Sequence, residues 1–207
     1  MTSIDSITLD VADPAAAERF YTNAFGLDAQ LRLRASQEPT TGFRGFTLSL
    51  TVAQPADVNA LIDAALDAGA TALKPVTKSL WGYGGVVRAP DGTIWKVATS
   101  AKKDTGPASK QIGDVVLLLG VANVAVSKQF YVDRGLTVAK SFGRVYVEFE
   151  TGSTVKLALY RRRALAKDAG VSPDGTGSHR IAVGGAAEPF TDPDGFAWET
   201  SALAAQS

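Results

Sequence analysis

Residues 191–199 read TDPDGFAWE, and residues 88–96 read RAPDGTIWK. Each stretch contains Pro-Asp-Gly, which is typical of a tight turn because proline presets one backbone angle and glycine accepts positive φ. Each turn leads into a predicted short strand that carries a tryptophan. The residue after that tryptophan is Glu199 in one copy and Lys96 in the other. The functional prediction depends on this exchange of a carboxylate for an ammonium group.

The sequence around these two turns repeats in a fixed order. A predicted strand is followed by a predicted helix with a Phe-Tyr pair and then by a Gly-Leu pair, at 20–27 and again at 130–136. Landmarks that recur in one order indicate an internal duplication. We therefore expect one domain over 1–100 and a second over 111–207. The Lys-, Ser-, Gly- and Pro-containing stretch between them, 101–110, is typical of a linker.

Hydrophobic periodicity predicts the elements inside each half. Residues 46–52 alternate between apolar and hydroxyl side chains, as in a strand buried on one side, and residues 56–68 have apolar side chains at helical spacing. Residues 36–42 and 172–178 are predicted to be loops. The halves are abridged differently. The first has only a loop where the second has strands over 145–160, and the second has no room for the middle helix of the first.

The composition excludes several classes of function. The formal net charge is zero, so there is no general electrostatic attraction to nucleic acid or to an anionic membrane. The chain contains no cysteine, which excludes disulfides, thiolate nucleophiles and Cys-ligated metals. Residues 1–5 do not read as the start of a signal peptide, and no apolar run has the length of a membrane span. We expect a cytoplasmic protein.

In the order of its motifs the chain resembles the vicinal oxygen chelate superfamily, which includes glyoxalases, bleomycin-resistance proteins and extradiol dioxygenases. The matching stretches span nearly the whole chain: residues 7–13 (ITLDVAD), both Phe-Tyr and Gly-Leu pairs, residues 57–70, 74–75 and 81–83, and both Pro-Asp-Gly-x-x-Trp segments. The resemblance implies an α+β fold of tandem βαβββ modules, forming two curled-sheet, glyoxalase-like domains, each of them abridged here. In enzymes of the superfamily a divalent metal in the cleft binds vicinal oxygens of the substrate.

The resemblance also implies where metal ligands would stand, including a glutamate in the strand after each Pro-Asp-Gly turn. In the first half the ligand places fall on Ser6, about Thr47, and Lys96. Neutral hydroxyls are poor ligands for a divalent cation, and an ammonium group repels one. No metal is expected in the first half.

In the second half the ligand places fall on Asp114, a residue within 179–182, and Glu199. An Asp-His-Glu set that includes His179 would suit iron, manganese or zinc. The strand alternation instead favours Ala182 at the ligand position, with His179 on the other side of the strand or just before it. His179 then has a structural role without a metal.

Two further groups of side chains are candidates for ligand binding. The strand alternation directs a polar group into the first cleft: Ser6, Thr8, Asp10, Thr47, Ser49 and Thr51. Such a cleft suits hydrogen-bonded recognition, although small residues that favour strands also occur without a ligand. The aromatic group is Trp81, Tyr83, Trp95 and Trp198. These rings either clamp a planar organic molecule or pack in the core.

The preferred hypothesis is that the protein binds a small organic molecule in the cleft between modules without a catalytic metal, as in the drug-sequestering branch of the superfamily. The ligand-binding residues would be Ser6, Thr8, Thr47, Ser49, Trp81, Tyr83, Trp95, Lys96, Asp114, Trp198 and Glu199. One alternative is a metal-dependent glyoxalase- or dioxygenase-type enzyme with Asp114, His179 and Glu199 as ligands. A second alternative is a non-catalytic scaffold that docks onto another protein. We expect a monomer or homodimer and no nucleic-acid or membrane partner, and the sequence identifies no catalytic residue.

Overall fold

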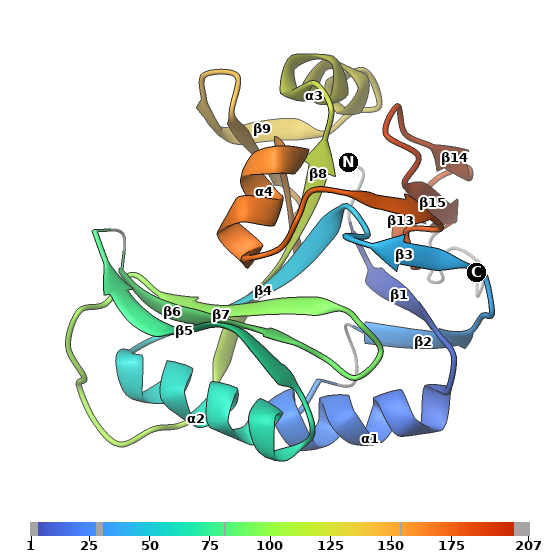
Figure 1. Ribbon diagram of the computed structural model, residues 1–207. Helices are drawn as coiled ribbons and strands as arrows, with labels where there is room; N and C mark the ends of the chain where they lie inside the picture. The colour runs from blue at the N-terminus through green and yellow to red at the C-terminus, as the bar shows by residue number, and fades with distance from the viewer. Residues whose placement is uncertain (1–3, 28–30, 81, 154, 201–207) are drawn as a thin grey trace.

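The strands pair into three sheets, two of them open and curled (Figure 1). The structure, a computed structural model, describes residues 4–27, 31–80, 82–153 and 155–200. In chain order the elements are β1 (Ser6–Val11), α1 (Pro14–Phe25), β2 (Leu31–Ala35), β3 (Thr40–Gly42), β4 (Phe46–Val52), α2 (Pro55–Asp67), β5 (Thr71–Ser79), β6 (Gly82–Arg88), β7 (Ile94–Thr99), β8 (Ile112–Val121), α3 (Val124–Asp133), β9 (Thr137–Phe142), β10 (Tyr146–Glu150), β11 (Val155–Arg161), α4 (Arg162–Ala169), β12 (Gly175–Gly177), β13 (Ile181–Ala186), β14 (Phe190–Thr191) and β15 (Ala197–Thr200).

The larger sheet has eight strands in the order β5-β6-β7-β4-β8-β11-β10-β9. It contains two complete βαβββ modules, β4-α2-β5-β6-β7 and β8-α3-β9-β10-β11, and these meet where β4 pairs antiparallel with β8. The smaller sheet has five strands in the order β14-β15-β13-β1-β2. It contains two abridged modules, β1-α1-β2 and β13-β14-β15, which meet where β1 pairs antiparallel with β13. The predicted α+β fold with tandem, abridged modules is confirmed.

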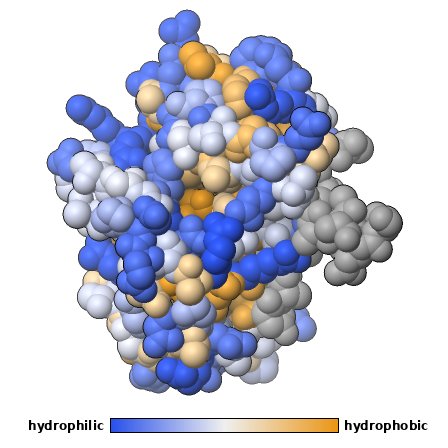
Figure 2. All heavy atoms as spheres, turned by 90° about the vertical axis from the view of Figure 1, so that its right-hand side faces the viewer, coloured by the Kyte–Doolittle hydropathy of each residue, from blue (hydrophilic) through white to orange (hydrophobic). Residues whose placement is uncertain are grey.

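Each large sheet therefore combines strands from both halves of the sequence. The proposed domains over 1–100 and 111–207 describe the repeat along the chain, whereas the seams β1–β13 and β4–β8 join those two ranges in space. On the face that carries β13 to β15, Figure 2 shows a largely hydrophilic surface, with hydrophobic residues visible in small separate groups. Among the described residues no helix has the length and apolar character of a membrane span.

Three short or irregular strands differ from the sequence prediction. The expected loops over 36–42 and 172–178 contain β3 and β12, which pair with each other. Their partners lie far apart in the chain, so local patterns do not reveal the pairing. β5 is also missing from the sequence prediction. It is an edge strand that contains Pro75, and its register with β6 is interrupted twice, features that edge strands tolerate and central strands do not.

Capping side chains mark the starts of α1 and α3, and a left-handed glycine ends α1. The Asp13 side chain accepts a hydrogen bond from the Ala16 N–H at the start of α1, and Gly26 ends that helix in the left-handed conformation. Asn123 caps α3 in the same way through the Ala125 N–H. Such side chains satisfy backbone donors that have no partner within the helix. The main core lies between these helices and the convex faces of the two sheets, where the inward residues of β4 and β8 are fully buried.

The recurring Phe-Tyr, Pro-Asp-Gly and Trp motifs form two hydrogen-bonded networks in that core. The Tyr21 hydroxyl donates to the Asp91 carboxylate over 2.6 Å and accepts from the Trp95 indole N–H over 3.4 Å. In the second network the Tyr131 hydroxyl donates to Asp192 over 2.6 Å, and Trp198 donates to that hydroxyl over 3.2 Å. The repeated residues therefore have a structural role, in packing and in hydrogen bonding.

Additional contacts attach the second Pro-Asp-Gly turn to the start of α3. The Asp194 carboxylate accepts hydrogen bonds from the Ser127 hydroxyl, over 2.6 Å, and from the Ala122 N–H, over 2.7 Å. Asp194 corresponds in the repeat to Asp91, yet Tyr131 bonds to Asp192 instead. The two networks thus use the same residue types with a shift of two positions in the turn.

The predicted linker over 101–110 is held against the N-terminus of α2. The Gln54 side chain makes no capping bond at this helix start, and the Asp104 carboxylate accepts from the Ala56 N–H over 2.7 Å instead. Gln54 Oε1 accepts from the Thr105 N–H over 2.7 Å, and Asp57 Oδ1 accepts from the Ser109 N–H over 2.7 Å. The linker is therefore part of the packed structure.

We expect Asp57→Ala to release this linker, because the buried Asp57 carboxylate is its anchor near Ser109. Trypsin cleavage after Lys102, Lys103 or Lys110 should become roughly tenfold faster, which corresponds to about 1.4 kcal/mol of lost local stability. Mass spectrometry of timed digests measures this rate. Asp63→Ala, at an exposed position on the same helix, is the matched control and should leave the rate unchanged. Equal rates in both variants would show that Asp57 does not anchor the linker.

Candidate functional site

Helix α4 lies on the concave face of the eight-stranded sheet, opposite the face covered by α2 and α3 (Figure 1). It follows β11 directly and ends at Gly170, which has the left-handed conformation. Its apolar residues Leu165, Ala166 and Ala169 are buried in a second, smaller core with Phe43, Val86 and Ile94. Part of the concave face is therefore filled by the chain itself.

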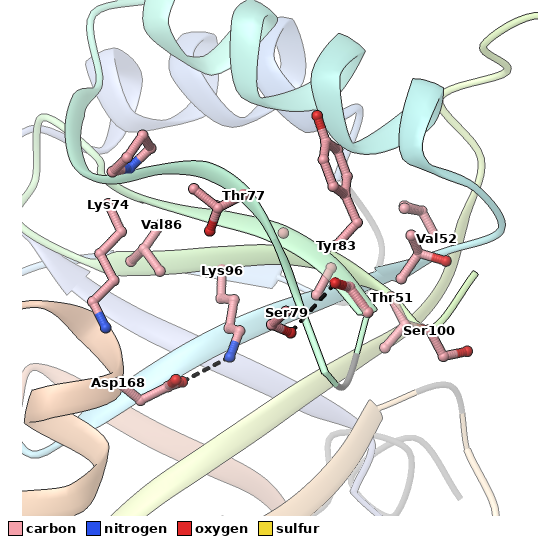
Figure 3. A pocket seen from close by; sticks show the side chains of 16 residues that line it. Thr51, Val52, Lys74, Thr77, Ser79, Tyr83, Val86, Lys96, Ser100 and Asp168 are labelled. Atoms are coloured by element: carbon pink, nitrogen blue, oxygen red, sulfur yellow. Dashed lines mark hydrogen bonds and ion pairs between the residues drawn. The ribbon is translucent and has the colours of Figure 1, made fainter. Parts of the chain in front are cut away.

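Beyond the C-terminal end of α4, the concave face opens into a pocket of about 540 Å³ (Figure 3). Strands β4 to β7 form its floor and wall, with Thr51, Thr77, Tyr83 and Ala98 among the lining residues. Tyr83 reaches the pocket only from the edge, since its side chain points toward α2 and its hydroxyl donates to Asn59 on that helix over 3.0 Å. The volume is in the range of small-molecule sites, about 300–1,000 Å³. We call this cavity the concave pocket.

Three charged side chains line the concave pocket: Lys74, Lys96 and Asp168. The Lys96 Nζ lies 2.8 Å from the Asp168 carboxylate, and their side chains are 36% and 43% exposed. The Lys74 ammonium donates to the Lys167 carbonyl, over 2.8 Å, in the last turn of α4. Figure 3 shows both lysine side chains extending from the sheet toward α4. Cations at this end of a helix interact favourably with its dipole.

The predicted hydroxyl group is divided between the two sheets. Thr47 and Ser49 lie on β4 of the eight-stranded sheet, whereas Ser6 and Thr8 lie on β1 of the five-stranded sheet, and all four are buried. Ser6 pairs with Gly184 and Thr8 with Ala182 in the β1–β13 seam. The expectation that these hydroxyls line one cleft is wrong, because β1 and β4 belong to different sheets.

The predicted aromatic clamp is likewise not assembled. Trp95 is fully buried, with its ring 5.4 Å from that of Tyr21 and 5.1 Å from that of Phe25. Trp198 is buried in the other network and stacks on Phe190 with ring centroids 5.2 Å apart. Both tryptophans lie on the helix side of their sheets, so the packing alternative holds for them. Trp81 lies outside the described residues, and the Tyr83 side chain points toward α2 from the edge of the concave pocket.

In the five-stranded sheet Glu199 is bound by an arginine. The Arg34 guanidinium donates to Asp10 over 2.7 Å and to Glu199 over 2.6 Å. These hydrogen bonds, with Asp10 first, raise the pKa of Arg34. The arginine therefore stays positively charged and neutralises the carboxylate that stands after the second Trp.

Known structures with a similar arrangement of modules cover nearly the whole chain. Glyoxalase I from Zea mays aligns with a TM-score of 0.64 and 14% identity, over 96% of this chain and 91% of that chain. A putative dioxygenase from Bacillus subtilis subsp. subtilis str. 168 aligns with a TM-score of 0.55 and 13% identity, over 88% of this chain and 70% of that chain. The chain has the vicinal oxygen chelate fold. No family model and no curated protein matches the sequence.

At these identities the vicinal oxygen chelate fold is shared, and the activity has to be inferred from the site. The residues at the implied metal-ligand places do not fit a divalent cation. Asp114 pairs with Lys156 over 2.8 Å on the eight-stranded sheet, while Glu199 pairs with Arg34 on the five-stranded sheet. Lys96 stands at a third place, and no cluster of three or more His, Asp or Glu side chains arranged to hold a metal occurs among the described residues.

His179 is occupied by backbone groups. Its Nδ1 lies 2.6 Å from the Arg44 carbonyl and its Nε2 lies 3.1 Å from the Asp194 carbonyl, and the ring stacks on Phe196 at 4.0 Å. Each ring nitrogen therefore faces a backbone carbonyl oxygen, which only accepts hydrogen bonds, and neither nitrogen is presented to a metal. The structure does not bring Asp114, His179 and Glu199 together. His179 links the loop at Arg44 to the second Pro-Asp-Gly turn.

Two features of the concave pocket were missing from the sequence prediction. One is the place of α4, since nothing local indicates that a short helix after β11 enters a sheet's concave face. The buried residues Leu165, Ala166 and Ala169 mark one apolar side of that helix and are the available signal. The other is the pair of charged residues Lys74 and Asp168. Residues 74–75 are part of the resemblance, but nothing in the sequence places Lys74 beside α4, and Asp168 reaches the pocket only through the placement of that helix.

Proposed function

We propose that this protein binds a small organic molecule in the concave pocket, and that binding needs no catalytic metal. The observation that carries the proposal is Lys96. It stands where metal-binding members of the superfamily have a glutamate, and its ammonium group is directed into a cavity of about 540 Å³. An ammonium group repels a divalent cation but binds anionic and polar organic groups. Sequestration requires binding alone, so the absence of a metal-ligand set at this position is no obstacle.

The composition of the wall supports the same conclusion. Apolar surface comes from Val86 and Ala98, and polar groups come from Thr51, Thr77 and Lys96. A wall that combines apolar surface with a few oriented polar groups is typical of small-molecule sites. Gly84 has no room for a side chain, because a Cβ there would lie 2.7 Å from the Val97 carbonyl oxygen.

A fragment screen by protein-observed NMR tests the proposal. We expect small aromatic compounds to shift backbone amides of the pocket, such as Gly84, Ala98 and Thr99, with and without a chelator. Ala98→Phe fills the pocket and should reduce the affinity at least tenfold. Val116→Phe is the matched control, because Val116 is a half-buried residue on the same sheet that does not line the pocket. Binding that maps elsewhere, or that requires added metal, would refute the proposal.

A further inference from the structure

The concave pocket carries an excess of positive charge. Its charged lining residues are two lysines and one aspartate, Lys74, Lys96 and Asp168. Lys74 makes its contact with a neutral backbone carbonyl, that of Lys167. One ammonium group of the pocket thus has no carboxylate partner within the described residues. A monoanionic ligand would neutralise the pocket.

The one carboxylate in the pocket is weakly held. The Lys96–Asp168 pair is more than a third exposed on both sides, and such pairs contribute about 0–1 kcal/mol because solvent screens them and side-chain entropy is lost. Asp168 lies near the C-terminus of α4, at the pocket rim, where its side chain can turn toward water. Exchange of Asp168 for another carboxylate at the Lys96 Nζ therefore costs little.

The rest of the pocket fits the remainder of an organic acid. Val86 and Ala98 offer apolar surface beside the ammonium group of Lys96. A flat apolar body can lie on this surface while its carboxylate reaches Lys96. No arginine lines the pocket, so the forked donor arrangement that favours phosphate is missing among its described residues.

We propose that the ligand of the concave pocket is a small monocarboxylate with an apolar body, whose carboxylate replaces that of Asp168 at the Lys96 ammonium group. This inference rests on the proposed function and names the chemical class of its ligand. Asp168 is then a competitor built into the site: it holds Lys96 in position when the pocket is empty and is displaced on binding. Lys74 supplies the second positive charge on the same side of the pocket.

The chain provides a matched control pair for the test. Lys156 and Asp114 form an ion pair of the same length, 2.8 Å, on the same sheet, with side chains that are 38% and 32% exposed. Neither residue lines the concave pocket. Substitutions in this pair reproduce the loss of charge and of a surface ion pair without altering the proposed site.

Isothermal titration calorimetry and NMR mapping with 1-naphthoate, its neutral analogue 1-naphthamide and phenyl phosphate test the inference. We expect naphthoate to bind in the pocket at least tenfold more tightly than naphthamide. Lys96→Met should weaken naphthoate binding at least tenfold and leave naphthamide binding unchanged, whereas Lys156→Met should alter neither by more than about twofold. Asp168→Asn should strengthen naphthoate binding severalfold, because the competitor is removed, and Asp114→Asn should not.

The outcomes separate this inference from the proposed function. If naphthamide and other neutral compounds bind in the pocket while naphthoate does not, the inference fails and the proposed function stands. If no compound of either kind binds there, both fail. Tighter binding of phenyl phosphate than of naphthoate would overturn the choice of carboxylate. Weaker naphthoate binding in Asp168→Asn would show that Asp168 supports the site and does not compete for it.

Discussion

Replacing Tyr131 by phenylalanine should destabilise the protein by about 3 kcal/mol, measured as the free energy of unfolding in denaturant titrations. The Tyr131 hydroxyl lies in the core between the Asp192 carboxylate and the Trp198 indole. Its removal leaves a buried charged acceptor with one partner fewer and a buried N–H donor with none. Charged groups that lose a hydrogen bond in the interior cost more than neutral ones.

The same variant should show a specific pH dependence. Burial raises the pKa of Asp192, and the hydrogen bond from Tyr131 partly opposes that rise. Without the hydroxyl the folded-state pKa rises further above the unfolded value, so the variant gains more stability than the wild type when the pH falls through it. We therefore expect the deficit of Tyr131→Phe to be largest near neutral pH and to shrink as the pH is lowered toward the ordinary range of Asp.

Tyr146→Phe is the control for loss of a tyrosine hydroxyl. Tyr146 donates to Glu148 over 2.9 Å on the half-buried face of β10. Neither residue is fully buried, so water can replace the lost bond and we expect a loss below about 1 kcal/mol. A similar loss in both variants, or a Tyr131→Phe deficit that grows on acidification, would contradict the role given to the Tyr131–Asp192–Trp198 network.

Leu165→Ala should cost about 2–4 kcal/mol of unfolding free energy, as expected for truncation of a buried leucine. Leu165 is 1% exposed on α4 and belongs to the second core with Phe43 and Ile94. The wall beside it is tight, since a Cβ on Gly120 would lie 3.3 Å from a Leu165 methyl group. Neighbouring residues can therefore do little to fill the space that the leucine side chain leaves, so the loss of unfolding free energy should lie toward the upper end of this range.

Thermal unfolding followed by circular dichroism gives this value, with Arg163→Ala as the control on the same helix. Arg163 is exposed, so its substitution should change the unfolding free energy by less than about 0.5 kcal/mol. If Leu165→Ala were equally mild, α4 would not be packed into the concave face. The position of the concave pocket would then lose its basis.

Local features of the chain were predictable from the sequence. The capped starts of α1 and α3, the alternation in β4 and the two Pro-Asp-Gly turns are encoded by neighbouring residues, and the structure has each of them. The order of these features was also sufficient to predict the fold. In this chain the repeated Tyr, Asp and Trp residues form the two core networks.

The site was less predictable because its contacts connect distant parts of the chain. Arg34 and Glu199 are separated by 165 positions, and Lys96 and Asp168 by 72. Neither pair lies within one element, so periodicity gives no indication of it. The exchange of Glu for Lys at position 96 was visible, and it directed attention to that strand. Its partner Asp168 on α4 was not visible. The position of a short helix after β11 depends on which sheet face the other helices leave uncovered, and the local sequence does not show this.

The seam between β1 and β13 has a consequence for the kinetics of folding. β1 spans Ser6–Val11, and its antiparallel neighbour β13 begins at Ile181. Until the segment that contains β13 has been synthesised, β1 can pair only with β2, and its other edge stays open. Pairings between such remote segments have a high contact order, which slows folding and leaves a strand edge open to wrong partners in the meantime. The five-stranded sheet is therefore expected to close late, after the eight-stranded sheet with its nearer seam has formed.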